Sequence, residues 1–484
     1  MIKSTLVFAF CFLSVTLFSQ TQNSSYTAIG KGVATTFLTD YQCLGINNSA
    51  LGWGTGYKNK KTTIGSSEFS FGIYSDSLNS SKLNNLYKSV KDDILNKNNS
   101  NSFNVNKQKE AVANYAEAGV SLFFDFNWAG FSYQGKKLGG IAFCIRENYQ
   151  FYSKFNKQTS DLIFRGNTSS YFDSLTIVMG VDTSKILNRA NISADTLNNA
   201  VLGSLSIPLN LSKLTFGSEV KMVWNRSYNL GYGRKIFEID SIISLFGGIG
   251  GRYIQSMAMF NLVSNDNGLH MFSAVTNNKS NLKFSLPKAV GQGYGIDLSA
   301  SVILFNKLKV AIAVNNIGNV TYNRNVYHVK DTLVGSLSVA GLSSLNVTQS
   351  VNQLLSDGGL LKLVGQEKYV MKNASDFRFG ASIQPWSFLN FGFDIVAPFN
   401  KENPGSIQNP VYSFGGEIRP LKWVALSAGY YGGGIYQKNI PVGINFICRD
   451  GAYEFGISSR DALSFFGKDK HGISMALGFA RVRF

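Results

Sequence analysis

The end of the chain constrains the fold more than any other part of the sequence. Phe484 is the last residue of an uninterrupted strand-like run that begins at Ile473. Soluble domains usually end in a frayed polar tail, whereas a closed β-barrel needs an intact last strand to pair with its first one. Losing that strand would leave two open edges in lipid, where each unsatisfied backbone group costs several kcal/mol. The terminus therefore favours a membrane β-barrel, and the C-terminal strand of a soluble sheet is the alternative.

The side chains of this last run alternate in two phases. Val482 and Phe484 share one face, and Arg481 and Arg483 share the other. A β-bulge near Ala480, or a change of face at the membrane border, would reconcile this phase with the upstream one. The sequence thus predicts that Val482 and Phe484 face lipid and that Phe484 is a signal for barrel closure. The upstream apolar residues lie in phase with the arginines instead: Ile473, Met475, Leu477 and Phe479.

The beginning of the chain has the features of an export signal. Lys3 supplies a positive charge, and Leu6 to Phe18 form an apolar core of signal-peptide length. This core is too short to span a membrane. We therefore expect residues 1–19 to be a signal peptide cleaved near Ser19, and the mature chain to reach the outer membrane of a Gram-negative cell envelope.

The composition fits a barrel better than a soluble enzyme of several domains. The chain has 48 glycines, 13% aromatic residues and only 15% charged residues, where soluble domains typically carry about 25% charged residues. Its net charge is +17, but the basic residues are scattered and form no arm of the kind that binds nucleic acid. Lipid phosphates, an acidic protein partner or an acidic solute are the anions that remain, and solvated loop lysines without a ligand are the alternative.

Strand and turn patterns dominate from Val120 onward. In residues 120–134 Phe124 and Phe126 fall on one face and Asp125 on the other, which is the alternation of a membrane barrel. The sequence predicts an all-β fold, a 14-stranded antiparallel up-and-down outer-membrane β-barrel. We expect a luminal plug over residues 20–57, a barrel over residues 58–484, and helical insertions at residues 76–117 and 329–370.

An internal repeat marks the last hundred residues. Residues 383–389 (Ile-Gln-Pro-Trp-Ser-Phe-Leu) match residues 418–424 (Ile-Arg-Pro-Leu-Lys-Trp-Val). Proline lacks an N–H and is tolerated at a tight turn but not inside a paired central strand. Each unit is therefore predicted to be a strand, a short turn and a strand, with aromatic residues at the membrane interface.

Signals for catalysis are weak. The three histidines are far apart, no GxSxG motif occurs, and the glycine-rich stretch at residues 291–297 is followed by strand sequence instead of a helix. We expect no enzyme activity, no cofactor and no metal site, although a dispersed Ser/His/Asn site of a membrane phospholipase is an alternative. Four carboxylates on predicted strands are expected to face the lumen: Asp125, Asp297, Asp394 and Glu417.

Two short motifs carry a resemblance to a known family. Residues 30–33 (Gly-Lys-Gly-Val), Thr39-Asp40 and residues 48–51 (Asn-Ser-Ala-Leu) resemble the N-terminal hatch of the long-chain fatty-acid outer-membrane transporter superfamily, with Ser49 where that family has proline. Residues 293–298 followed by residues 314–318 resemble a strand pair of the same barrels. The resemblance implies a barrel of 14 strands with an N-terminal plug, whose candidate hatch residues are Asn48, Ser49 and Ala50.

Two functions are compatible with this resemblance. The first is a channel or transporter for a small hydrophobic solute, in which the N-terminal segment is the hatch. The second is a non-conducting accessory barrel that binds partner proteins of an outer-membrane secretion or assembly machine. In both cases we expect outer-membrane lipid and the barrel assembly machinery as partners, with a hydrophobic small molecule or a protein as a further one.

Overall fold

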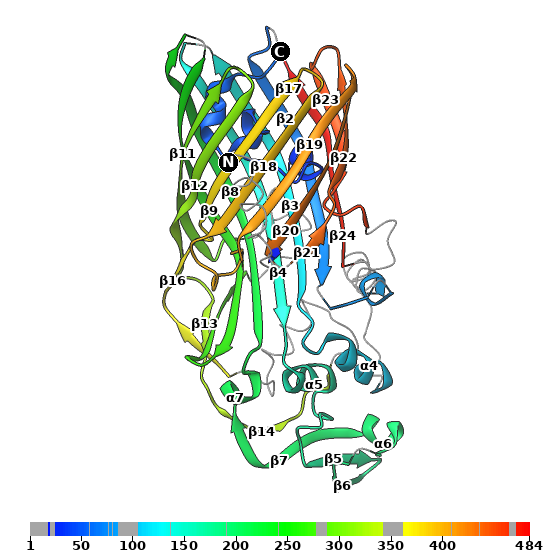
Figure 1. Ribbon diagram of the computed structural model, residues 1–484. Helices are drawn as coiled ribbons and strands as arrows, with labels where there is room; N and C mark the ends of the chain where they lie inside the picture. The colour runs from blue at the N-terminus through cyan, green and yellow to red at the C-terminus, as the bar shows by residue number, and fades with distance from the viewer. Residues whose placement is uncertain are drawn as a thin grey trace, which may run out of the picture.

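The computed structural model (Figure 1) describes most of the chain, with the N-terminal residues and several internal segments outside the description. The described residues are 18–19, 25–57, 59–75, 77–79, 81–85, 105–135, 137–189, 191–240, 242–276, 288–341, 362–407, 409–434, 436–463 and 471–484. Most of the predicted signal peptide therefore lies outside the described residues.

Fourteen antiparallel strands form a closed barrel, as predicted from the sequence. Each strand pairs with the next along the wall, and the last strand pairs with the first, so that no edge is left open in the wall. The strands of the wall are β2 (Thr62–Ser75), β3 (Val120–Gly135), β4 (Gly139–Lys154), β8 (Glu219–Ile239), β9 (Ile243–Asn265), β11 (Gly291–Leu304), β12 (Leu308–Tyr322), β17 (Asp376–Trp386), β18 (Leu389–Pro398), β19 (Val411–Leu421), β20 (Val424–Gly434), β22 (Val442–Cys448), β23 (Tyr453–Ser459) and β24 (Gly472–Arg483).

The two ends of the barrel differ in the length of their connections. Short turns lie at the end that carries the C-terminus, at the top of Figure 1, and the long connections lie at the other end. This asymmetry is typical of outer-membrane barrels, whose short turns are periplasmic. The elements at the extracellular end are α4 (Val105–Tyr115), α5 (Lys157–Arg165), β5 (Ser174–Met179), β6 (Asp182–Leu187), α6 (Ala194–Asn198), β7 (Ala200–Asn210), α7 (Leu211–Thr215), β10 (Gly268–Val275), β13 (Val326–Val329), β14 (Leu333–Leu337), β15 (Leu363–Gln366), β16 (Tyr369–Lys372) and β21 (Tyr436–Asn439).

A small second sheet protrudes beyond the barrel. It has the strand order β14-β7-β5-β6 and lies at the bottom of Figure 1. A cluster of buried apolar residues, including Leu162, Phe164, Leu211 and Phe260, fills the region between this sheet and the extended strands β8 and β9. Two residues of the predicted signal peptide, β1 (Phe18–Ser19), pair with β20 and β21 at the same end.

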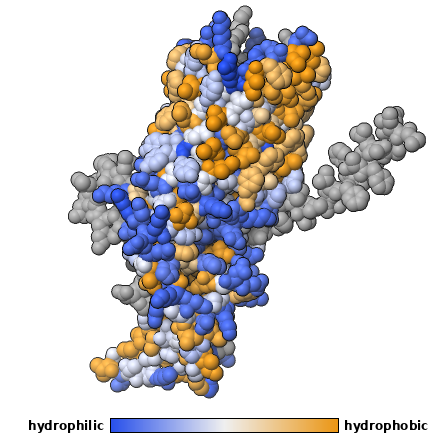
Figure 2. All heavy atoms as spheres, turned by 90° about the vertical axis from the view of Figure 1, so that its left-hand side faces the viewer, coloured by the Kyte–Doolittle hydropathy of each residue, from blue (hydrophilic) through white to orange (hydrophobic). Residues whose placement is uncertain are grey.

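The outer face of the barrel is apolar and its inner face is polar. Figure 2 shows apolar side chains gathered on the barrel, with a polar zone between the barrel and the protruding sheet. A continuous apolar surface of this kind needs lipid or protein to cover it, and on a closed barrel it marks the membrane band. Among the described residues, no helix is long and apolar enough to cross a membrane. Exposed side chains of the outer face include Ile64, Phe143, Ile249, Ile317, Phe414 and Ile457.

The change of phase in the last strand is confirmed. The pairing of β23 with β24 shifts register between Glu454↔Arg481 and Gly456↔Gly478, so β24 has one extra residue at the expected place. Val482 and Phe484 are 40% and 60% exposed, whereas Arg481 and Arg483 are buried. The bulge therefore turns both arginines into the lumen while apolar residues continue to face outward.

The two proline units of the repeat have the same structure. In β17 and β18 the register shifts between Ile383 and Trp386, and in β19 and β20 it shifts between Ile418 and Leu421. In each unit the proline and the residue before it oppose a single residue of the partner strand, which is the pattern of a bulge. The predicted strand-turn-strand repeat is confirmed, and exposed aromatic residues, such as Trp386, flank the turns.

The prediction of helix in the insertion at residues 329–370 is wrong for the residues that the structure describes. Residues 329–370 were expected to be partly helical, but their described residues form β14, β15 and part of β16, and residues 342–361 lie outside the description. The reason is long-range pairing: β13 pairs with β15 and β16 pairs with β12, so the insertion extends the barrel wall. In the other insertion, residues 76–117, the helix α4 is present, while residues 86–104 lie outside the described residues.

The terminal strand yields a first prediction. The backbone of Phe484 donates to Thr62 and accepts from Lys61 and Thr62, and its ring faces outward. Replacing Phe484 with Asp places a charge on the lipid face next to the closing pair of strands, so we expect the folded fraction in membranes to fall several-fold. Faster migration of the folded barrel on an unheated gel measures this fraction. Val181→Asp, a change at a 99% exposed position of the protruding sheet, is the control. Equal folding of both variants would contradict the prediction.

Candidate functional site: a plug in a glycine-lined lumen

Residues 25–57 fill the lumen of the barrel and form its plug. This segment contains α2 (Tyr26–Ile29) and the short 3₁₀ helices η1 (Asp40–Cys43) and η2 (Asn48–Trp53), which lie inside the wall in Figure 1. Nearly all its residues from Ser25 to Leu51 are buried. Its hydrogen bonds reach strands on different sides of the barrel, including β2, β4, β11, β12, β18 and β24.

Glycines on adjacent strands form a flat socket for the hatch residues. A Cβ atom on Gly233 of β8 would lie 2.2 Å from the carbonyl oxygen of Asn48, and one on Gly248 of β9 would lie 2.1 Å from the nitrogen of Ser49. Gly231 and Gly250 meet the side chains of Leu44 and Asn48 in the same way. Because alternate residues of a strand share a face, these glycines leave a side-chain-free wall against which the plug backbone packs.

Pairs of inward-facing glycines contact the plug at two other places on the wall. Gly65 of β2 and Gly130 of β3 face the ring of Tyr41, where added Cβ atoms would lie 1.8 Å and 2.2 Å from its atoms. Gly415 of β19 and Gly429 of β20 face the carbonyl oxygen of Lys31, which would lie 1.8 Å and 2.3 Å from Cβ atoms added to them. Glycine in a strand interior weakens the strand and often marks such a close approach, so these inward-facing glycines make room for the plug.

A buried ionic network joins the plug to the closing strands. Arg481 of β24 donates to Asp40 of the plug and, at 3.1 Å, to Glu454 of β23. Arg483 bonds the same Glu454 at 2.5 Å. Lys31 Nζ of the plug lies 2.6 Å from Glu417, and this pair lines the same cavity as Glu454 and both arginines. All these side chains are at most 8% exposed, and breaking a buried pair leaves an uncompensated charge.

The structure places all four carboxylates selected from the sequence on the inner side of the wall. Asp394 accepts from the backbone nitrogens of Ala34 and Thr35 in the plug, at 2.7 Å and 2.9 Å. Glu417 pairs with Lys31, as described above. Asp297 bonds Arg252 at 2.6 Å and the nitrogen of Asn316 at 2.7 Å, while Asp125 accepts from Asn148 and lines a cavity.

The three hatch residues and several residues that the sequence did not single out complete the site. Asn48, Ser49 and Ala50 are buried in η2, and the nitrogen of Ser49 donates to Ser299 Oγ at 2.8 Å. Glu68 of β2 was missed, although it accepts from Tyr41 at 2.6 Å and Gln42 at 2.8 Å. The signal that could have found it is a carboxylate inside an otherwise apolar and small-residue strand, since such a group needs an internal partner.

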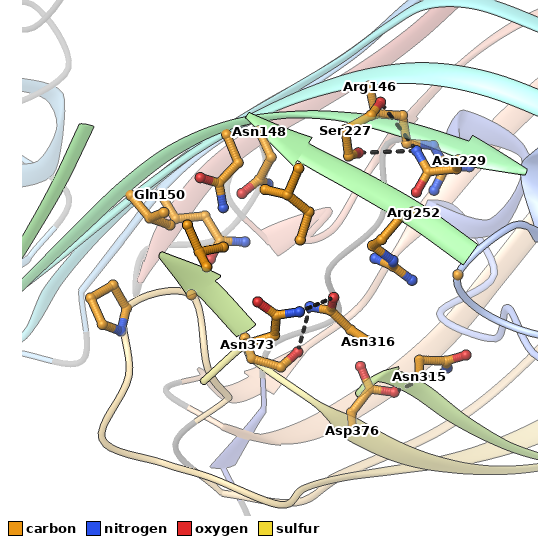
Figure 3. Close-up of a pocket in the computed structure, with 18 of the residues that line it drawn as sticks. Arg146, Asn148, Gln150, Ser227, Asn229, Arg252, Asn315, Asn316, Asn373 and Asp376 are labelled. Carbon is orange, nitrogen blue, oxygen red and sulfur yellow. Dashed lines mark hydrogen bonds between the residues drawn. The ribbon is translucent and has the colours of Figure 1, made fainter. Parts of the chain in front are cut away.

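Two polar cavities lie in the lumen, one on each side of the plug. The extracellular one has a volume of about 140 Å³ and is lined by Gly45 and Ile46 of the plug together with wall residues (Figure 3). The periplasmic one has a volume of about 210 Å³ and borders Lys31 and Arg483. A groove of about 630 Å³ lies elsewhere, on the outer face, and is lined mainly by apolar side chains of β8, β9, β11 and β12.

Comparison with solved structures finds outer-membrane barrels at low sequence identity. One is the TodX monoaromatic hydrocarbon channel with segments S2 and S3 deleted: 8% identity, 95% of this chain and 97% of that one covered, TM-score 0.46. A FadL homologue of Pseudomonas aeruginosa has 8% identity, 97% and 99% coverage and a TM-score of 0.41. The translocator domain of the autotransporter NalP from Neisseria meningitidis has 8% identity, 89% and 90% coverage and a TM-score of 0.32.

No protein-family model matches the chain, and no curated protein matches it. The assignment of the barrel does not depend on similarity, because the strand pairings of the chain itself close the sheet.

The glycine socket yields a second prediction. Gly248→Val adds side-chain atoms where the plug backbone lies, so the plug must move away from the wall, and we expect antibiotics that intact barrels exclude to enter cells several-fold faster. Gly251→Val in the same strand is the matched control, because nothing lies within 4 Å of a Cβ atom there. Growth inhibition by vancomycin measures entry. Equal sensitivity of the two variants would show that the socket does not hold the plug.

The ionic network yields a third prediction. Asp40→Asn keeps the size of the side chain and tolerates the positive φ of 53° at this position, but it leaves the charge of Arg481 without its plug partner. We expect the free energy of unfolding to fall by about 3 kcal/mol. Urea-induced unfolding in lipid vesicles measures it. Asp450→Asn, in an exposed turn, controls for a general loss of negative charge, and an equal effect of both changes would refute the prediction.

Proposed function

We propose that this protein is an outer-membrane transporter for a small hydrophobic solute and that its plug gates the route. The observation that carries the proposal is the position of the apolar groove on the outer face. Gly248 and Ser299, which line the groove, are also among the wall residues that contact Ser49 of the plug. The groove and the hatch residues therefore lie back to back, separated by a single layer of backbone.

The chemistry of the groove suits an apolar solute. Tyr232, Ile249, Leu298 and Ile312 border it, and each is at least 40% exposed toward the lipid side. Burial of apolar surface against such a wall is favourable by about 25 cal/mol per Å². A solute that binds in the groove is in contact with the membrane interior, so it does not need to cross a polar surface to enter the lipid.

The wall beside the groove is irregular, which supports an opening there. The pairing of β11 with β12 shifts register between Ile296 and Leu298, and Asn316 on the opposing strand has a φ of 60°. A bulge removes ladder hydrogen bonds and bends the strand. In this proposal, displacement of residues 48–50 from the socket exposes this stretch of wall to the lumen, and the solute passes between the lumen and the groove.

The partners in this proposal are outer-membrane lipid on the apolar face and, during insertion, the barrel assembly machinery that recognises the terminal strand ending at Phe484. No bound group is required, and within the described residues no cluster of three or more potential metal ligands occurs.

A reversible lock tests the gate. Ser49 Oγ lies 2.6 Å from Ser301 Oγ, so Ser49→Cys with Ser301→Cys places two sulfurs close to disulfide geometry. With Cys448 replaced by Ser to remove the exposed thiol, we expect uptake of the hydrophobic dye N-phenylnaphthylamine by expressing cells to fall to background when oxidised and to recover on reduction. The single Ser301→Cys variant is the control.

A second function is favoured by a different observation, the protruding sheet. Met179, Val181, Leu187, Ile207 and Leu333 of this sheet and its turns are more than half exposed, and exposed apolar residues of this kind often mark protein contacts. In this alternative the barrel is a non-conducting accessory protein that binds partners of a secretion or assembly machine. Dye uptake by the wild type equal to that of cells without the protein would refute the transporter and favour the accessory barrel.

A further inference from the structure

The extracellular cavity of the lumen is lined by polar side chains that have no role in the proposed transport of an apolar solute. Its floor is formed by Gly45 and Ile46 of the plug, and its roof by Pro404 and Gly405 of the connection between β18 and β19. Side chains of β3, β4, β8, β9, β12 and β17 complete the wall and point toward one space in Figure 3. The cavity is therefore a compartment with a floor, a roof and a wall of both polar and apolar side chains.

Carboxamide groups make up most of the polar side chains of this wall. Each carboxamide offers both a donor and an acceptor, and two of these groups, Asn225 and Asn315, have a side-chain oxygen that is buried without a hydrogen-bond partner in the described part of the chain. Asn315 itself is only 1% exposed. Leaving such groups unpaired costs free energy, so the wall is built for a polar occupant. The carboxamides are those of Asn148, Gln150, Asn225, Asn229, Asn315, Asn316 and Asn373.

The charges of the cavity balance. Arg252 pairs with Asp297 at 2.6 Å and Arg378 pairs with Asp376 at 2.9 Å. The guanidinium of Arg146 donates to carbonyl oxygens of the plug at 3.1 to 3.3 Å, and the carboxylate of Asp125 faces the same cavity. A bare anion would meet two carboxylates in this lining, and an apolar solute would leave the carboxamides unpaired.

We propose that this cavity binds a small neutral polyhydroxylated solute, of the size and chemistry of a monosaccharide. Hydroxyl groups are both donors and acceptors, as carboxamides are, so the two sets of groups match without any net charge on the ligand. The cavity volume of about 140 Å³ corresponds to roughly ten water positions, which is close to the number of heavy atoms of a hexose. Arg146 and Asn315 also hold carbonyl oxygens of the plug, so the bound solute contacts the same side chains that keep the plug in place.

Equilibrium dialysis of the purified full-length barrel in detergent against radiolabelled D-glucose tests this site. We expect one glucose per barrel. Asn225→Leu should weaken binding at least tenfold, because it removes a side-chain oxygen that has no partner in the described structure and keeps the size of the side chain. Gln150→Leu, a second variant of the lining, should have the same effect if Asn225→Leu does not fold. Asn390→Leu, which alters the periplasmic cavity, should leave binding unchanged.

Three results would overturn the proposal. They are glucose retention no higher than that of detergent alone, equal binding by the wild type and both lining variants, and tighter binding of acetate than of glucose. The site is separate from the outer groove, so a failure here would leave the proposed transport of a hydrophobic solute untouched, and a failure of dye uptake would leave glucose binding untouched.

Discussion

The architecture depends on the close approach of the plug backbone to the barrel wall. A chain segment inside a lumen must satisfy its polar backbone groups and fit among the inward-facing side chains at the same time. Here glycines on β2, β3, β8, β9, β19 and β20 remove those side chains at the points of contact. Carboxylates and arginines then fix the plug by hydrogen bonds from the remaining inward positions, such as Asp394 and Arg481.

The last strand connects barrel closure with plug retention. Its outward residues, Val482 and Phe484, face lipid, while its inward arginines hold Asp40 and Glu454. A single extra residue near Ala480 allows both sets of contacts on one strand. Closure and plugging are therefore coupled, because a strand that fails to pair also fails to present Arg481 to the plug. The groove on the outer face and the cavity in the lumen lie on opposite sides of this plugged wall.

Sequence patterns within single strands and hairpins predicted most strands of the barrel wall. Alternation identified β3 and β4, and the proline repeat identified β17 to β20. The patterns gave 14 or 15 strands, and 14 was chosen because such barrels have an even number. Asp394 and Glu417 were found because a carboxylate on a strand with apolar neighbours has to face the lumen. The partners of these groups were not predictable, since Asp394 and Ala34 are 360 positions apart in sequence and their contact exists only when the plug is folded inside the barrel. The described strands of residues 329–370 were missed for the same reason, because β16 is specified by its pairing with β12.

The central claim is that residues 26–54 are held as firmly as the wall in the unliganded protein. Amide hydrogen exchange in lipid vesicles, read by mass spectrometry of peptides, tests it most directly. The account predicts that peptides of the plug exchange as slowly as those of β8 and β9. Exchange of the plug at the rate of the exposed turn at residues 180–182, with the wall still protected, would contradict it.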